Sequence, residues 1–341
     1  MEEVMFDFPI GIQLFNRPEY AKNMLESLSN QTIPINQEKL FIFIDGFKGS
    51  VYEDRGSRDQ TSQVKNLAKT IFPFSKVVNF QENLGIASLH LKLQQRTFAG
   101  PEEWAVFFEE DVVLDPSYLE EIKKLIEIVN DCDTVVNVAC FQILPTITNL
   151  SRGYDGFYPG HGTQAFAERK NFFLQKAKML EAFIEIEKNS DYPIQYSSKK
   201  SSMVKDSSRI SKLASFYGLG GLINSYNHDL AMNSFLVQNG KLHVVSKPNL
   251  ATDIGVEGIH HYITPTLEKP KIIKRPDLSI EEKKIEFQNS LASIKFEVDQ
   301  NAYNNYRMIL EGYYTSLSGR AMVAKIVEIF IRKITAAFRK L

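Results

Sequence analysis

Short apolar runs alternate with segments of helical period over the first 130 residues of the chain. Residues 10–15, 40–44 and 104–108 are apolar runs bounded by polar residues, which is typical of buried strands. Between the first two runs, apolar residues recur at helical spacing after Pro18, which suits the first position of a helix: Ala21, Met24, Leu25 and Leu28. We therefore predict successive βα units and a mainly parallel sheet flanked by helices, the α/β class.

Further elements follow the same pattern. Helices are expected over 60–71 and 86–98, strands at 77–80 and 135–142, and a helix that begins at Asp115 and Pro116, an N-cap and first-turn pair. The segment 197–211 is rich in Ser and Lys and has no hydrophobic period, so we expect a flexible loop or lid. Beyond Pro265 the pattern is helical throughout.

Composition excludes several classes of protein. The chain has 341 residues with 40 Lys and Arg against 41 Asp and Glu, a balance that argues against a nucleic-acid binder. Its two cysteines, Cys132 and Cys140, can form neither a disulfide framework nor a metal site of recognisable spacing. The first residues do not resemble a secretory signal, and no run is long and apolar enough to span a bilayer. We therefore expect a reduced, cytoplasmic, globular protein.

Polar side chains follow the predicted strands at Asn16-Arg17, Asp45-Gly46 and Glu109-Glu110-Asp111. Ligands bind outside the carboxyl ends of strands in open α/β sheets. Three adjacent carboxylates repel one another and need a counter-charge, which Mg²⁺ or Mn²⁺ can supply by binding one or two carboxylates and a substrate diphosphate. The alternative is a solvated acidic turn before a helix, where the helix dipole favours acidic residues.

Four segments together resemble a known family. FNRPEY (15–20), FIDG (43–46), ENLG (82–85) and FFEEDVVLDPSYLE (107–120) are similar to motifs of GT-A nucleotide-sugar glycosyltransferases. The acidic segment most resembles the Glu-Asp-Asp version found in N-acetylglucosaminyltransferase I and related bacterial enzymes, but here Glu110 stands in the middle. The resemblance implies a Rossmann-like GT-A fold, Asp111 as the ligand of Mn²⁺ or Mg²⁺, and a nucleotide-sugar site formed by Asn16, Arg17, Asp45, Asn83, Gly85, Glu109 and Glu110.

The likeness continues more weakly to residue 262. HGTQAF (161–166) resembles the acceptor-side segment before a helix, and YNHDL (226–230) resembles the motif that carries the catalytic base, here Asp229, although His228 replaces the family's frequent Trp. Residues 247–255 and 258–261 resemble a closing motif, in which His261 (or its neighbour His260) is the expected second metal ligand. The alternatives for this pair are a contact with the diphosphate or a position on the surface. The implied organisation is a glycosyltransferase domain over 1–262, with a nucleotide-binding half (1–145) and an acceptor half (146–262), and a helical extension over 263–341.

The last helix is amphipathic and net basic. Its apolar stripe comprises Val323, Ile326, Val327, Phe330, Ile334, Phe338 and Leu341. Three interpretations stay open: packing on the same domain, pairing with a second copy in a homodimer, or peripheral contact with an anionic membrane at its inner face. Packing or dimerisation is favoured over membrane contact.

The sequence thus predicts a metal-dependent, inverting glycosyltransferase that moves a hexosyl group from a nucleotide-sugar donor to a hydroxyl of a glycan or lipid-linked acceptor. Asp229 would take the proton of that hydroxyl, because the hydroxyl is a poor nucleophile at its own pKa. One alternative is a nucleotidyltransferase. Such an enzyme normally has a Gly-rich, basic loop after its first strand that binds a triphosphate, and the residues at that place here, Asn16-Arg17-Pro18-Glu19, do not form one. The other is a non-catalytic nucleotide- or glycan-binding protein of the same fold.

Overall fold

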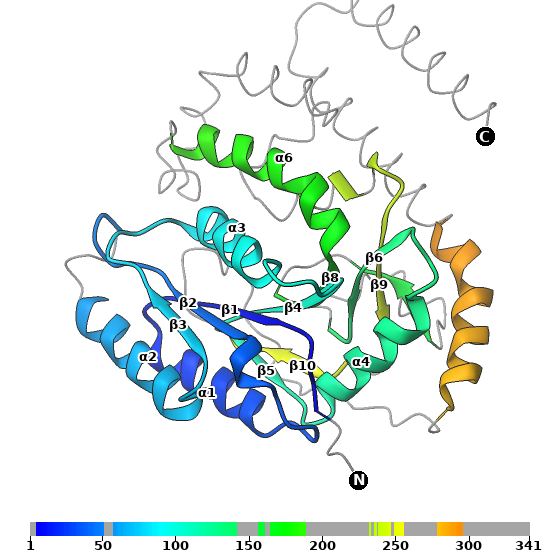
Figure 1. Ribbon diagram of the computed structural model, residues 1–341, viewed down its shortest axis with the longest axis horizontal. Helices are drawn as coiled ribbons and strands as arrows, with labels where there is room; N and C mark the ends of the chain where they lie inside the picture. The colour runs from blue at the N-terminus through cyan, green and yellow to red at the C-terminus, as the bar shows by residue number, and fades with distance from the viewer. Residues whose placement is uncertain are drawn as a thin grey trace, which may run out of the picture.

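A computed structural model of the chain describes residues 5–50, 57–141, 156–160, 164–188, 232, 235–236, 238–246, 249–255 and 278–295. Within them, an eight-stranded sheet has the order β3-β2-β1-β4-β8-β6-β9-β7 (Figure 1). Its strands are Ile10–Leu14 (β1), Leu40–Ile44 (β2), Lys76–Asn79 (β3), Trp104–Glu109 (β4), Val135–Ala139 (β6), Phe157–Pro159 (β7), Ala165–Arg169 (β8) and Leu242–Ser246 (β9). The predicted α/β class and the mixed, mainly parallel, Rossmann-like sheet are confirmed.

The parallel half of the sheet is the part that the apolar runs predicted. Strand β1 lies between β2 and β4 and pairs with both in parallel, with Leu14 opposite Ile44 and Gln13 opposite Glu109. Strand β3 completes this half by pairing in parallel with β2. Because the chain leaves β1, β2 and β4 at the same edge, the polar residues that follow these strands are brought together.

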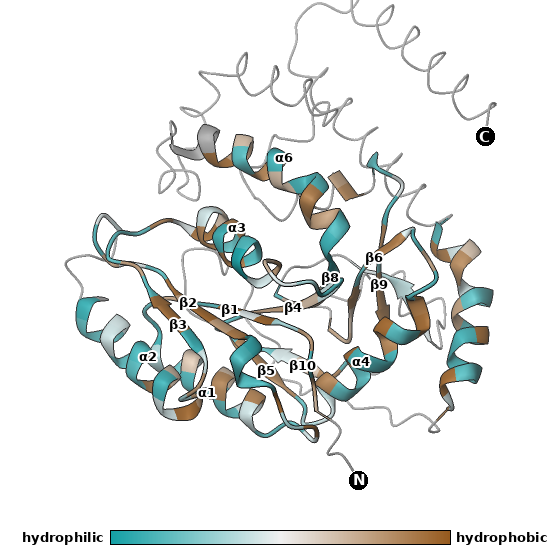
Figure 2. Ribbon diagram, viewed as in Figure 1, coloured by the Kyte–Doolittle hydropathy of each residue, from teal (hydrophilic) through white to brown (hydrophobic). Residues whose placement is uncertain are grey.

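Helices cover both faces of the sheet (Figure 1). They are Pro18–Ser29 (α1), Ser57–Ile71 (α2), Ile86–Thr97 (α3), Tyr118–Val129 (α4) and Lys170–Lys188 (α6), with a short 3-10 helix at Gln37–Lys39 (η1). Apolar residues of α1, α2 and α4 form one core layer with the sheet, and those of α3 and α6 form another on the opposite face. Figure 2 shows the central strands as mostly hydrophobic, while each helix carries both hydrophobic and hydrophilic residues.

The second half of the sheet is antiparallel around β8. Strand β8 pairs in antiparallel fashion with β4 and β6, and β7 pairs likewise with β9. The segment 161–166 was expected to precede a helix; residues 161–163 lie outside the described part, Ala165 begins β8, and α6 follows directly at Lys170. A strand therefore stands between this segment and the helix.

A small two-stranded sheet lies beside the acidic cluster. Val112–Leu114 (β5) pairs in antiparallel fashion with Ala251–Asp253 (β10). The pairing ends with a hydrogen bond from the Ile254 N–H to the Asp111 carbonyl oxygen, 2.8 Å long. Residues 251–254 of the expected closing motif are therefore held against the residues that follow β4.

The predicted start of α4 was wrong by a few residues. The helix begins at Tyr118, its N-cap residue is Ser117, and no side chain caps it. Asp115 instead accepts hydrogen bonds from the backbone N–H and the hydroxyl of Ser117, at 2.9 and 2.7 Å. Its carboxylate is used in the turn before the helix, because the short strand β5 places Asp115 outside the first helical turn.

A helix over residues 280–295 packs on the same body as the sheet. Its Phe287 and Ile294 are buried in the core layer that contains α1, α2 and α4. Lys283 on this helix forms a salt bridge with Glu121 on α4, with an N–O distance of 2.7 Å. This part of the expected extension is therefore tied to α4, while the boundary near residue 262 and the last helix lie outside the described residues.

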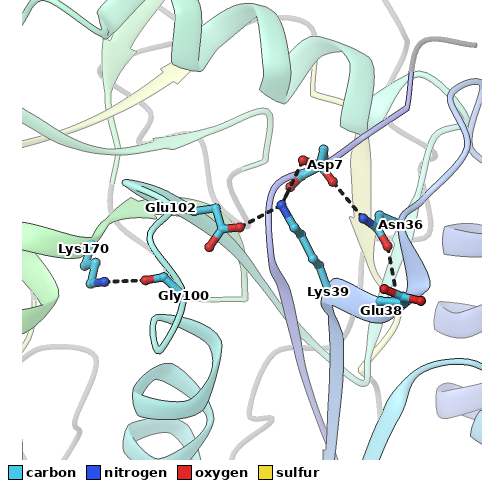
Figure 3. Close-up of polar contacts among 7 residues, drawn as sticks. All are labelled: Asp7, Asn36, Glu38, Lys39, Gly100, Glu102 and Lys170. Carbon is cyan, nitrogen blue, oxygen red and sulfur yellow. Dashed lines mark hydrogen bonds and ion pairs between the residues drawn. The ribbon is translucent and has the colours of Figure 1, made fainter. Parts of the chain in front are cut away.

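A polar network joins the elements that enter the sheet at the opposite edge, before β1, β2 and β4 (Figure 3). Lys39 pairs with Asp7 and Glu102 at 2.8 and 2.7 Å, and Asp7 also accepts a hydrogen bond from Asn36. Ion pairs at the surface contribute about 1 kcal/mol or less each. The network ties loops together at the end of the sheet remote from the acidic cluster. No helix in the described ranges has the length and apolarity needed to cross a membrane.

Candidate functional site

The carboxyl ends of β1, β2 and β4 bring most of the predicted site residues to one edge of the sheet. Asn16 and Arg17 follow β1, Asp45 follows β2, and Glu109 closes β4 just before Glu110 and Asp111. Asn83 and Gly85 lie in the connection from β3 to α3, and they reach the same edge through hydrogen bonds to Asp45. The edge therefore carries polar groups from four separate connections.

Asp45 is buried and organises the loops around it. Its Oδ1 accepts hydrogen bonds from the N–H groups of Gly46 and Leu84, both 2.8 Å long. Its Oδ2 accepts from the Asn83 side chain and the Gly85 N–H, at 3.0 and 3.2 Å. Four donors match the roughly four acceptor positions of a carboxylate. Asp45 therefore fixes the first turn of α3 against the end of β2, and a nucleoside contact by this side chain stays a prediction.

Gly46 and Gly85 allow this close approach for two different reasons. Asn83 donates a second hydrogen bond to the Gly46 carbonyl oxygen, 2.9 Å long, which draws the two loops together. A Cβ on Gly46 would lie only 2.3 Å from the carbonyl carbon of Glu82. Gly85 has open space around it but adopts φ +77° and ψ 156° at the N-cap position of α3, a conformation that is essentially restricted to glycine.

Replacing Gly46 with alanine is expected to lower the free energy of unfolding by about 1–3 kcal/mol, because backbone must move to admit the methyl group. Urea unfolding measures this loss. Gly100→Ala is the matched control, since its new Cβ would meet only the end of the Glu102 side chain, at 2.2 Å. That side chain can turn away for the loss of its ion pair with Lys39, which is worth about 1 kcal/mol or less. An equal loss in both variants would show that the loop contact at Gly46 is not special.

Burial raises the pKa of Asp45 to about 6, although the N–H groups of Leu84, Gly46 and Gly85 oppose the shift. The folded protein then binds a proton on Asp45 more tightly than the unfolded chain does. The stability from this group is fully present below the unfolded pKa of 3.8 and is lost as the pH rises through about 6.

Lowering the pH from about 7.5 to about 5 should therefore stabilise the wild-type protein by about 1.4 kcal/mol relative to Asp45→Asn, which cannot titrate. Urea unfolding of both proteins at the two pH values measures the difference. Parallel changes in the two proteins would contradict the shifted pKa of Asp45.

Glu110 and Asp111 lie at the end of β4 and are buried, with 6% and 3% of their surfaces exposed. Arg17 contacts both: its Nε donates to Glu110 Oε1, and its Nη2 donates to Asp111 Oδ2 at 3.0 Å. The Phe15 N–H donates to the second oxygen of Glu110, at 2.8 Å. The counter-charge that was expected from a divalent cation is therefore supplied, in part, by Arg17 of the chain itself.

The carboxylates of Glu110 and Asp111 stabilise the charged form of Arg17. Burial acts to lower the pKa of Arg17, but Glu110 and Asp111 outweigh it, and the net shift is upward. Burial raises the pKa of Glu110, and the charge of Arg17 opposes this shift. The guanidinium thus faces two carboxyl groups, while Glu109, at the end of β4, is only half-buried.

The carboxylate oxygens of Glu110 and Asp111 are donors of the kind that Mg²⁺ or Mn²⁺ prefers, and both carboxylates contact the guanidinium of Arg17. In the part of the chain that the structure describes, no group of three or more His, Cys, Asp and Glu side chains is arranged to hold a metal. A cation at this pair of carboxylates would need its other ligands from a bound diphosphate or from water. The expected base Asp229 and the expected ligand His261, with His260, lie outside the described residues.

No protein-family model and no curated protein matches the chain in sequence. Its structure is similar to that of S. aureus TarS 1-349 in complex with UDP-GlcNAc, with 14% identity over 50% of this chain and 47% of that chain and a TM-score of 0.34. The complex of TarS 1-349 with UDP matches at 12% identity over 68% and 70% of the two chains, TM-score 0.37. The mannosyltransferase PcManGT from Pyrobaculum calidifontis, in complex with GDP-Man and Mn²⁺, matches at 12% identity over 69% and 72%, TM-score 0.36.

The chain covers about half the length of the TarS 1-349 chain in the UDP-GlcNAc complex and 29% of the longer TarS chain. The proteins to which it is similar thus include a mannosyltransferase, and their complexes contain nucleotide sugars or a nucleoside diphosphate. The finer family assignment to the N-acetylglucosaminyltransferase I type is not confirmed by these comparisons.

Three residues near the edge were not singled out from the sequence. Tyr20 lies one helical turn after Arg17, with its ring centroid 4.8 Å from the guanidinium carbon. Gln13 and His90 are buried beneath the edge, between β1 and α3, where the His90 Nδ1 and the Gln13 Oε1 are 3.3 Å apart. Tyr20 belongs to the FNRPEY segment, so its position in that motif was an available signal. The pairing of Gln13 with His90 joins residues 77 positions apart and leaves no local signal.

Proposed function

We propose that the chain is a glycosyltransferase that binds a nucleotide-sugar donor at the carboxyl edge of β1, β2 and β4. The observation that carries the proposal is the convergence, at one edge, of a buried Glu110–Asp111 pair, the guanidinium of Arg17 and the loops organised by Asp45. Oxygen ligands and a guanidinium side by side suit a metal-bound diphosphate. The resemblance of the four sequence segments to GT-A enzymes supports the same assignment.

Each group at the edge has a proposed task. Asp111, with Glu109 and Glu110 around it, would hold Mn²⁺ or Mg²⁺, which stabilises the negative charge that develops on the leaving diphosphate. Arg17 adds positive charge beside the same position. Asn16, together with the loops that Asp45 joins, would border the nucleoside, and Asn83 and Gly85 would border the donor.

The acceptor step belongs to the second half of the chain. Asp229 would remove the proton of an acceptor hydroxyl as the new glycosidic bond forms, and direct attack by that hydroxyl inverts the anomeric configuration. The acceptor class that we propose is a glycan or a lipid-linked glycan. Glu109, which is half-buried at the end of β4, would help to shape the sugar site.

Thermal-shift measurements with UDP, GDP, UDP-GlcNAc and GDP-mannose, with and without Mn²⁺, test the proposal. We expect at least one of these compounds to raise the melting temperature in a manner that depends on Mn²⁺. A donor-hydrolysis assay on wild type and Asp229→Asn follows, with loss of turnover expected in the variant. Stabilisation without turnover in either protein would indicate a binding protein, and no stabilisation by any compound would refute the nucleotide-sugar site.

A further inference from the structure

The guanidinium of Arg17 lies against both carboxylates of the Glu110–Asp111 pair. Its Nε contacts Glu110 and its Nη2 contacts Asp111, so one planar group bridges the two carboxylates. The carboxylates are almost fully buried, whereas 28% of the Arg17 side chain is exposed. Of the three side chains, that of Arg17 therefore has the most open surroundings.

The backbone of Arg17 is fixed, and its side chain spans the distance to the acidic pair. Arg17 is the N-cap residue of α1; its carbonyl oxygen accepts a hydrogen bond from Ala21, and Pro18 follows it. The ring of Tyr20 contacts the guanidinium from the α1 side, with 4.8 Å between the guanidinium carbon and the ring centroid. A change of side-chain rotamer can therefore release the carboxylates without moving β1 or α1.

The guanidinium of Arg17 and a divalent cation would compete for the carboxylates of Glu110 and Asp111, because both are positively charged. Both are attracted to the same two carboxylates, and both cannot contact the same Asp111 oxygen. A cation alone must therefore displace a buried, hydrogen-bonded ion pair and leave the positive charge of Arg17 without a partner. A diphosphate that arrives with the cation removes this cost, because its oxygens accept hydrogen bonds from a guanidinium well.

We propose that Arg17 is the resident counter-ion of the Glu110–Asp111 pair in the donor-free protein, and that a divalent cation and a nucleoside diphosphate displace it together. This inference rests on the proposed function. It adds that the cation binds weakly in the absence of the nucleotide and tightly in its presence. The two ligands then have a positive coupling free energy, and each raises the affinity of the protein for the other.

Isothermal titration calorimetry with Mn²⁺, first alone and then with saturating UDP or GDP, measures this coupling. In the wild type we expect the nucleotide to tighten Mn²⁺ binding by about 10-fold or more. In Arg17→Gln, Mn²⁺ alone should bind about 10-fold tighter than in the wild type, and the further gain from the nucleotide should be smaller than in the wild type. Unchanged Mn²⁺ affinity in Arg17→Gln would overturn the proposal.

Arg96→Gln is the matched control. Arg96 is exposed on α3, and its guanidinium also lies over an aromatic ring, that of Phe41, at 5.8 Å from the centroid. Unlike Arg17, it does not bridge two carboxylates among the ion pairs of the described residues. This variant should keep both the Mn²⁺ affinity and the coupling of the wild type. Weakened coupling in Arg96→Gln would overturn the assignment to Arg17.

A second variant and a second readout keep the proposal testable if Arg17→Gln folds poorly. Arg17→Lys retains one charge but cannot bridge two carboxylates with a planar fork, so its Mn²⁺ affinity should be intermediate. Mn²⁺ should also raise the melting temperature of Arg17→Gln more than that of the wild type. The Mn²⁺ titration needs no nucleotide: failure of UDP and GDP to bind would refute the proposed function, while tighter Mn²⁺ binding by Arg17→Gln would still establish the counter-ion.

Discussion

Replacing Asp111 with asparagine is expected to lower kcat/KM for sugar transfer by about 10³-fold, the order found when a group that stabilises transition-state charge is removed. Asparagine keeps the shape of the side chain but removes the negative charge that faces Arg17 across 3.0 Å. The proposed cation loses its direct ligand, and the charge on the leaving diphosphate is then poorly neutralised. A transfer assay with the nucleotide sugar identified by thermal shift measures the change.

Asp115→Asn supplies the control for this prediction. Asp115 is four residues further along the chain, and its carboxylate is used only in hydrogen bonds to Ser117 among the contacts described. We expect this variant to retain nearly the full transfer rate, with at most a modest loss of stability. A transfer rate in Asp111→Asn close to that of the wild type would show that the acidic pair is structural, as the alternative of an acidic turn requires.

The strands that could be predicted from the sequence are those with a local signal. Strands β1, β2 and β4 are mainly apolar and buried on both faces, and such runs are typical of the centre of a parallel sheet. Strands β5, β7 and β10 have three residues each, too few to show a period. Strand β8 was missed because it ends in Glu168 and Arg169, which are buried but charged.

Charged residues of β8 are tolerated because distant groups satisfy them. Arg169 donates a hydrogen bond to the Val129 carbonyl oxygen at 3.0 Å and another to the Asn130 carbonyl oxygen, and so caps the end of α4. It also lies over the ring of Trp104, with 4.9 Å to the centroid. These partners are 39 to 65 positions away in the sequence, so no local pattern indicates that the segment is a buried strand.

At the candidate site, likewise, the sequence predicts which residues gather but not which partners they contact. The motifs at the strand ends predicted which residues gather at the edge, because parallel strands deliver their carboxyl ends to one side. They did not predict that Asp45 would accept hydrogen bonds from Asn83, Leu84 and Gly85, or that Arg17 would pair with Glu110 and Asp111. Those contacts depend on how closely separate loops approach, and tertiary packing alone determines that distance.

Replacing Lys176 with methionine is expected to lower the free energy of unfolding by about 3–5 kcal/mol, the range for removal of one partner from a buried ion pair. Lys176 on α6 and Glu168 on β8 are fully buried and 2.5 Å apart. Gln94 on α3 donates to the other oxygen of Glu168, at 2.6 Å, so the pair also holds α3. Urea unfolding measures the loss, and Lys178→Met, the same change at an exposed position of α6, should cost less than about 0.5 kcal/mol.

The double variant Lys176→Met with Glu168→Gln tests whether the loss comes from the uncompensated charge. Without Lys176, Glu168 must either stay ionised in the core or take up a proton, and burial already raises the pKa of this carboxyl against the opposing charge of Lys176. Glutamine removes that charge and can still accept the hydrogen bond from Gln94, so the double variant should recover most of the stability. If it were no more stable than Lys176→Met, lost packing between α6 and β8 would explain the effect instead.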